Sequence, residues 1–177
     1  AGGDTASRYA EVLSFTRLAR RVADAMGSAA EECLDNGGRV VAMAAAAKNL
    51  ASRLTAYAAV ETKPEFLTGL IDAVDEFKRC CISSGDLSRA AGETEGSLAQ
   101  KLEELSLLVE SYDALCSRGK RDPREQMTWL LEQMEQGDFA KEHVFYIDGF
   151  PDFTRQHLAI LEHLIQASPD VTVSLNC

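Results

Sequence analysis

The residue best placed to do chemistry is Asp148, which follows the apolar run of residues 144–147. Gly149 and Pro151 come directly after it and end the run. A short β-branched and aromatic run that is bounded by turn residues is typical of a strand buried on both faces. An acid at the carboxyl end of such a strand lies where open α/β sheets bind their ligands. The pattern therefore predicts a strand over 144–148 with a carboxylate at its ligand-binding end.

Two interpretations of Asp148 stay open on the residues alone. Its carboxylate could hold the magnesium ion that bridges nucleotide phosphates, or it could cap the turn that follows the strand. A hydrolytic site usually places a second acid next to the first to orient water, but Gly149 stands there. No G-x-x-x-x-G-K-[ST] phosphate loop occurs in the sequence, and Tyr146 stands where a phosphatase of the D-x-D-G type needs its nucleophile. We therefore predict no catalytic residue.

A second candidate site is formed by consecutive residues near the start of the chain: Ser14, Phe15, Thr16 and Arg17. They follow a predicted strand over 11–15 and open a predicted helix over 17–26, which Thr16 is expected to cap. Two hydroxyls, an aromatic ring and a cation in this position could hold a phosphate and stack a base of single-stranded DNA. The alternative is a capped helix with Phe15 in the core. The three histidines and five cysteines show no metal-ligand spacing, so no metal site is predicted.

The elements that must position these residues follow from apolar periodicity and from Gly and Pro breaks. Helices are predicted over 17–26, 39–60, 65–81, 97–117, 124–136 and 154–167, strands over 11–15, 144–148 and 171–176, a turn at 83–86 and a loop over 89–96. Strands separated by helices indicate a parallel sheet with right-handed crossovers. We predict an α/β fold whose small three-stranded parallel sheet, in the order 11–15, 144–148, 171–176, carries a large all-helical insertion. The last strand is expected to expose an edge where a further strand belongs.

Composition limits the function classes. The formal net charge of -10 means that the net field does not attract DNA phosphates, so any nucleic-acid contact needs a local basic patch. No run approaches the roughly 20 apolar residues of a membrane span, and no secretory signal is seen at the start. The sequence therefore predicts a cytoplasmic protein without a membrane partner.

Three segments together carry a family resemblance: VLSFTRLARRV near the start, VFYIDGFPDFTRQHLAILEHLI, and VTVSL at the end. They resemble the B subunit of the bacterial ATP-dependent helicase/deoxyribonuclease, the AddB/RexB type, over about residues 10–177. The N-terminal half of that family looks like a superfamily I helicase that has lost its motor activity. The resemblance implies a partial RecA-like P-loop NTPase domain, helicase domain 1A, over 9–27 and 140–177, with a helical 1B-like insertion over 28–139.

The resemblance also assigns roles to residues. Residues 12–19 match helicase motif Ia, so that Ser14, Phe15, Thr16 and Arg17 would touch single-stranded DNA. Residues 144–150 match motif II, in which Asp148 keeps the magnesium-side acid and Gly149 replaces the catalytic Glu. ATP with magnesium and an iron–sulfur cluster are implied for the parent protein, with the phosphate loop and the nuclease domain outside this chain. The A subunit of the helicase/nuclease heterodimer is the implied protein partner.

We therefore expect a fragment of a helicase/nuclease subunit that acts in double-strand break repair and homologous recombination. It would bind or scan single-stranded DNA and would not unwind, cleave or hydrolyse ATP by itself. The alternative is an autonomous helical protein-interaction module with no nucleic-acid role, which the acidic charge balance favours.

Overall fold

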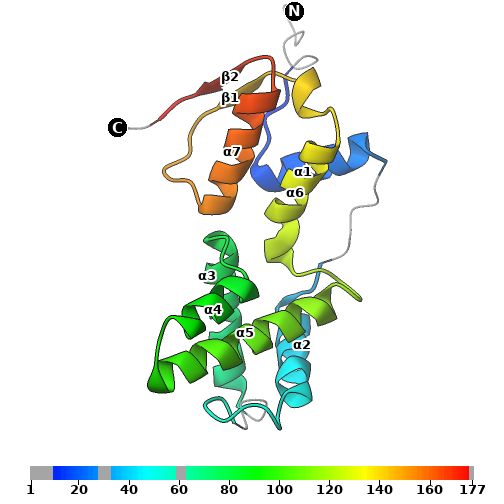
Figure 1. Cartoon of the computed structure of the whole chain (residues 1–177). Coiled ribbons are helices and arrows are strands. Elements are labelled where there is room, and N and C mark those ends of the chain that lie inside the picture. The colour runs from blue at the N-terminus through cyan, green and yellow to red at the C-terminus, as the bar shows by residue number, and fades with distance from the viewer. Residues whose placement is uncertain (1–9, 28–32, 59–62, 176–177) are drawn as a thin grey trace, which may run out of the picture. The chain divides into compact units, whose positions relative to one another are not determined.

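A computed structural model describes residues 10–27, 33–58 and 63–175, and its contacts divide the chain into two units. One unit, called here the sheet unit, comprises residues 1–30, 126–151 and 159–177, and the other, the helical unit, comprises residues 31–125 and 152–158. The elements, drawn in Figure 1, are α1 (Phe15–Ala25), α2 (Asn36–Asn49), α3 (Pro64–Arg79), α4 (Ser84–Gly92), α5 (Gly96–Cys116), η3 (Pro123–Glu125), α6 (Gln126–Gln136), η4 (Ala140–Glu142), β1 (Phe145–Ile147), α7 (Arg155–Ala167) and β2 (Val171–Val173). The functional division into a RecA-like part and an insertion stays a prediction.

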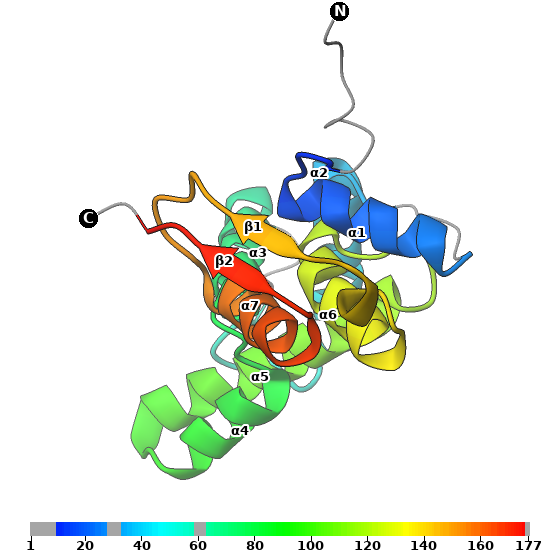
Figure 2. The same ribbon diagram turned by 90° about the horizontal axis from the view of Figure 1, so that it is seen from above.

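The strands of the sheet unit pair as predicted, but the sheet is smaller. β1 and β2 run parallel, with Phe145 opposite Val171 and Ile147 opposite Val173, and they lie side by side in Figure 2. Among the described residues this sheet has two strands. The predicted third strand over 11–15 is wrong, because residues 11–14 carry no strand pairing and Phe15 already begins α1.

The local reason for this correction is the cap of α1. Ser14 has extended backbone angles, and its hydroxyl accepts a hydrogen bond from the backbone N–H of Arg17 at 3.3 Å. Ser14 is thus the N-cap, not Thr16 as predicted, and the helix starts two residues earlier. α1 packs on α6, with Val22 of α1 and Leu130 of α6 fully buried. Of the apolar residues in this segment, Phe15 belongs to the buried face of α1, whereas Val12 is 91% exposed.

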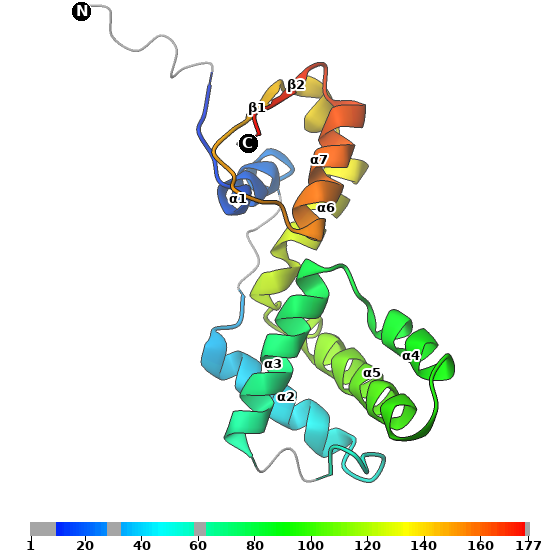
Figure 3. The ribbon, with the colours of Figure 1, turned by 90° about the vertical axis from the view of Figure 1, so that its left-hand side faces the viewer.

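The helical unit forms around α5, against which α2 and α4 pack, while α3 packs on α2. Figure 3 shows these four helices clearly. Met43, Leu70, Val74 and Leu108 lie in its core. Among the helices of the described ranges, none combines the length and apolarity that crossing a membrane requires.

Three predictions in this unit are wrong. The helix predicted over 39–60 ends at Asn49, since Leu54 turns into the core and the next three backbone N–H groups bind a carboxylate. α4 covers Ser84–Gly92, so the turn predicted at 83–86 is a helix start, and residues 89–92 of the loop predicted over 89–96 are helical. α4 begins with a capping box, in which the side chains of Ser83 and Asp86 each accept a hydrogen bond from the other residue's backbone N–H. This cap favours a helix more strongly than the polar composition of the segment favours a loop.

Candidate functional site

The first candidate segment presents polar side chains at the start of α1. Ser14, Thr16 and Arg17 are exposed, whereas Phe15 is buried with 9% of its surface accessible. Arg20 is exposed one turn further along the helix. A helix N-terminus with an adjacent guanidinium suits an anion such as a phosphate. The segment can therefore bind a phosphate, but the Phe15 ring is not open to a base.

The second candidate lies at the carboxyl end of β1. Asp148 is exposed, and it makes no hydrogen bond or ion pair among the residues that the structure describes. Gly149 has φ +79°, a left-handed conformation in which a Cβ atom is strained. The backbone at position 149 therefore suits glycine and disfavours the glutamate that a hydrolytic motif would carry there.

The structure brings these two sequence-distant segments together. The rings of Phe15 and Phe150 have centroids 5.2 Å apart at an angle of 57° between their planes. This is a favourable tilted aromatic contact, and Phe150 follows Asp148 by two residues. The start of α1 and the turn after β1 are thus neighbours within the sheet unit.

A magnesium–nucleotide site is not complete in the described residues. Asp148 supplies one carboxylate, and no group of three or more His, Cys, Asp or Glu side chains that could hold a metal occurs among residues 10–27, 33–58 and 63–175. The sequence holds no phosphate loop that would cradle a nucleotide. The residues present therefore do not fit ATP with magnesium, or an iron–sulfur cluster, without further parts.

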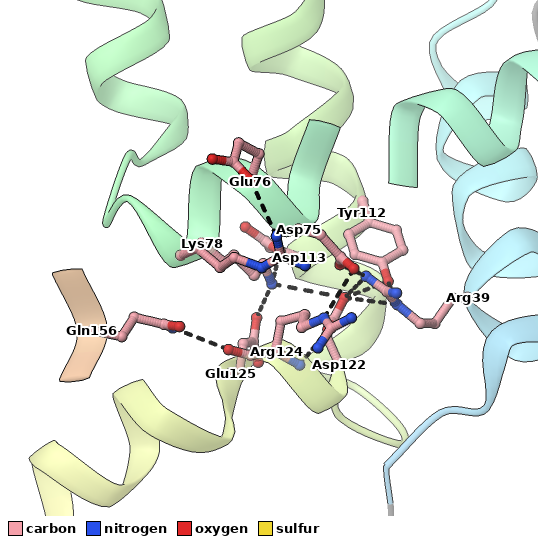
Figure 4. A network of polar contacts seen from close by, with 11 residues as sticks. Arg39, Asp75, Glu76, Lys78, Tyr112, Asp113, Asp122, Arg124, Glu125 and Gln156 are labelled. Carbon is pink, nitrogen blue, oxygen red and sulfur yellow. Dashed lines mark hydrogen bonds and ion pairs between the residues drawn. The ribbon is translucent and has the colours of Figure 1, made fainter. Parts of the chain in front are cut away.

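The helical unit contains a buried ionic network that the sequence did not predict (Figure 4). Arg39 of α2 is 3% exposed and forms an ion pair with Asp75 of α3. Its guanidinium also lies 3.2 Å from the carboxylate of Asp122, which is fully buried. The hydroxyl of Tyr112 donates to Asp122 at 2.5 Å. Arg124 adds a second ion pair to Asp75 at 2.9 Å.

Lys78 extends this network on α3. Its ammonium lies 2.8 Å from Asp113 and 2.7 Å from Glu125, and 5.7 Å from the centre of the Tyr112 ring. Each buried charge thus has a partner of opposite sign, which is the condition under which burial of charge is tolerated. The network joins α2, α3, α5 and the segment around η3.

The pKa shifts of three charged members of the network favour their charged forms. Burial opposes the charge of Arg39 and Lys78, but the neighbouring carboxylates outweigh it and raise the pKa of both. Burial likewise opposes the charge of Asp75, yet the hydrogen bonds from Arg39 and Arg124 lower its pKa. Burial raises the pKa of the Tyr112 hydroxyl. These shifts favour the protonation states that the observed ion pairs and hydrogen bonds require, which supports a structural role for the network.

A further buried carboxylate, outside the network, accepts hydrogen bonds from the backbone. Glu104 of α5 accepts hydrogen bonds from the backbone N–H groups of Thr55, Ala56 and Tyr57, each at 3.0 Å. Burial works against its charge, but these bonds outweigh it and lower its pKa to about 2. Glu104 therefore fixes the segment that follows α2 onto α5.

Sequence patterns gave little indication of these residues. Arg39 and Asp122 are 83 residues apart and Arg39 and Asp75 are 36 apart, so no local spacing joins them. One usable signal was Asp75, which lies four residues after Ile71, a residue of the apolar stripe of α3. A charge within an apolar stripe indicates a buried partner.

This chain is similar to a protein family and to several proteins along almost its whole length. The profile of a family described as "ADDB, N-terminal" matches residues 2–177. A Thermoanaerobacter protein, named as the B subunit of an ATP-dependent helicase/deoxyribonuclease, is 31% identical over 168 residues, which cover 94% of this chain. Proteins of the same name from Alkaliphilus metalliredigens and Clostridium acetobutylicum are 28% and 26% identical over 96% and 98% of the chain. The chain spans only 14% or 15% of the length of these three relatives.

Proposed function

Since the chain belongs to the family described as "ADDB, N-terminal", we propose that it is the helicase-like N-terminal portion of the B subunit of an ATP-dependent helicase/deoxyribonuclease. Relatives of that name match it along almost its whole length. In this proposal the intact protein pairs with the A subunit of the heterodimer and acts in double-strand break repair and recombination.

The role of this portion is to bind single-stranded DNA. The supporting observation is the Phe15–Phe150 contact, which joins the start of α1 to the turn after β1. Ser14, Thr16 and Arg17 are exposed beside it and would hold a phosphate of the strand. Phe15, being buried, acts as a positioning residue for this segment and does not stack on a base.

The chain contributes no motor activity of its own. Gly149, held at φ +79°, stands where the acid that orients water would be, and Asp148 would provide a single magnesium ligand. Any nucleotide or iron–sulfur cluster would depend on groups that the rest of the full-length protein supplies.

Fluorescence anisotropy with a labelled single-stranded oligonucleotide tests the proposal on the full-length protein. Arg17→Ala should weaken DNA binding about fivefold at low salt and reduce the slope of log K against log salt by about 0.7, as loss of one phosphate contact predicts. Arg53→Ala, an exposed arginine of the helical unit, is the matched control and should leave both values unchanged. Equal binding by Arg17→Ala and the unmodified protein would contradict the assignment of this segment. Failure of the full-length protein to bind single-stranded DNA would favour the helical interaction module instead.

A further inference from the structure

Two free thiols follow one another where α3 ends in the helical unit. Cys80 is half-buried and Cys81 is exposed, and neither belongs to a disulfide. The thiol of Cys80 donates to the carboxylate of Glu76 at 3.7 Å. The two sulfur atoms also interact, because the charge of Cys80 contributes to the raised pKa of Cys81. Two accessible thiols at this spacing can react in turn with one small molecule.

The backbone holds Cys81 in a conformation that usually selects glycine. Its φ is +54°, and no other non-glycine residue of the described ranges has a positive φ. The cause is a Schellman motif at the end of α3, in which the N–H of Cys81 donates to the carbonyl of Lys78 at 3.1 Å and that of Ile82 to the carbonyl of Phe77 at 2.8 Å. A Cβ atom is strained at this position. Since Cys81 is exposed, packing does not explain its side chain, and such an outlier points to a function.

A cation from α7 acts on the same thiol. Partial desolvation raises the pKa of Cys81, and the positive charge of Arg155 opposes this rise. Arg155 begins α7, and its contacts place it in the helical unit together with both cysteines. Its side chain is exposed and forms no ion pair with the residues that the structure describes. A guanidinium in this position attracts an anionic reactant towards the thiols.

We propose that Cys80 and Cys81 form a reversible redox pair that an anionic disulfide of low molecular weight oxidises. The thiolate of one cysteine attacks a sulfur atom of the small disulfide and expels one small thiolate, which takes up a proton. The neighbouring cysteine then loses its proton and attacks the mixed disulfide. This step forms the bond between Cys80 and Cys81 and expels the second small thiolate. Two protein thiols are thus oxidised by two electrons, and the small disulfide is reduced to two thiols.

The bond between neighbouring residues is readily reduced again. Consecutive Cα atoms lie about 3.8 Å apart across a trans peptide, whereas the Cα atoms of bridged cysteines usually lie about 4.4–6.8 Å apart. A disulfide outside this range is strained and more reducible, which is typical of regulatory and not of structural disulfides. The pair therefore suits a switch and not a permanent cross-link. It lies in the helical unit and does not depend on the proposed binding of DNA.

Peptide mass spectrometry of the full-length protein, treated with oxidised glutathione, tests the proposal. Trypsin cleaves after Arg79 and Arg89, so the peptide of residues 80–89 contains Cys80 and Cys81 and no other cysteine. We expect this peptide to lose two hydrogen atoms and to regain them when reduced glutathione is added in excess. Cys116, which is 1% exposed, is the internal control and should stay a thiol. The proposal is overturned if the peptide stays unoxidised, retains a bound glutathione, links to another cysteine or resists reduced glutathione.

Variants of the full-length protein separate the steps. Cys81→Ser should stop at a mixed disulfide between Cys80 and glutathione, because the second thiol is missing. Arg155→Gln should slow oxidation by oxidised glutathione about threefold at low salt, since one nearby positive charge is lost, but it should not slow oxidation by cystamine, a cationic disulfide. Arg53→Gln, at an exposed arginine of the same unit, is the matched control. Equal rates with oxidised glutathione for the two arginine variants would overturn the assignment of an anionic oxidant.

Discussion

The two units of this protein satisfy their polar and apolar groups in different ways. The helical unit pairs its buried charges internally: Arg39 binds Asp75 and Asp122, and Glu104 binds three backbone N–H groups. The sheet unit leaves Tyr146 76% exposed and the outer edge of β2 without a neighbour among the described residues.

This difference indicates which unit can be stable by itself. Buried ion pairs cost desolvation energy, and they persist where their geometry is complete. A two-stranded sheet gains little from its own hydrogen bonds and depends on packing to both sides. We therefore expect the helical unit to carry most of the stability of the isolated chain, and the sheet unit to depend on the rest of the full-length protein.

The largest effect should come from removing the central cation of the network. Arg39→Met leaves Asp75 and Asp122 buried without their main partner, and we expect a loss of about 3–5 kcal/mol in the free energy of unfolding. Denaturant unfolding followed by far-ultraviolet circular dichroism measures it. Arg53→Met removes an exposed arginine of the same unit and should change the value by less than about 0.5 kcal/mol. Similar stabilities for the two variants would show that the network does not hold the helices together.

A smaller effect with a distinct pH dependence is expected at Glu104. Its pKa is about 2 in the folded chain and 4.5 ordinarily, so its contribution of about 3 kcal/mol is complete above about pH 5 and is lost as pH falls towards 2. Glu104→Gln should cost about this amount at neutral pH. The free energy of unfolding of the Glu104→Gln variant should also fall less steeply on acidification than that of the unmodified chain. Protonation of Asp75, whose pKa is also lowered, still contributes to the loss of stability in both proteins.

The neighbouring Glu103→Gln is the matched control for this pH profile, since Glu103 is exposed on the same helix. It should keep both the neutral stability and the steep acid slope. Identical acid slopes for the Glu104→Gln variant and the unmodified chain would contradict the role given to this carboxylate.

The sequence predicted the elements whose signals are local and consistent. The apolar stripe of α5 predicted that helix, and α7 was predicted between the two β-branched runs. The strands β1 and β2 pair in parallel, as predicted. The strand predicted over 11–15 was wrong because a helix start and a strand look alike in a segment this short. Its decisive signal was the side chain of Ser14, which caps α1.

The candidate site was predicted only in part, for a different physical reason. The sequence indicated Ser14–Arg17 and Asp148 as candidate residues. It did not predict that the rings of Phe15 and Phe150 would lie with their centroids 5.2 Å apart. The ionic network depends on residues up to 83 positions apart, which only the folded chain brings together. Whether Arg17 binds DNA and Asp148 binds magnesium stays a prediction.

Amide hydrogen exchange of the 177-residue chain tests the central difference most directly. Protection reports the free energy of local opening, so the helices α2, α3 and α5 should exchange slowly, while β1 and β2 should exchange orders of magnitude faster. In the full-length protein, exchange in β2 should be slower, including at the N–H groups of Val171 and Val173. Equal protection of β2 and α5 in the isolated chain would contradict the account, because it would show that the sheet is already complete.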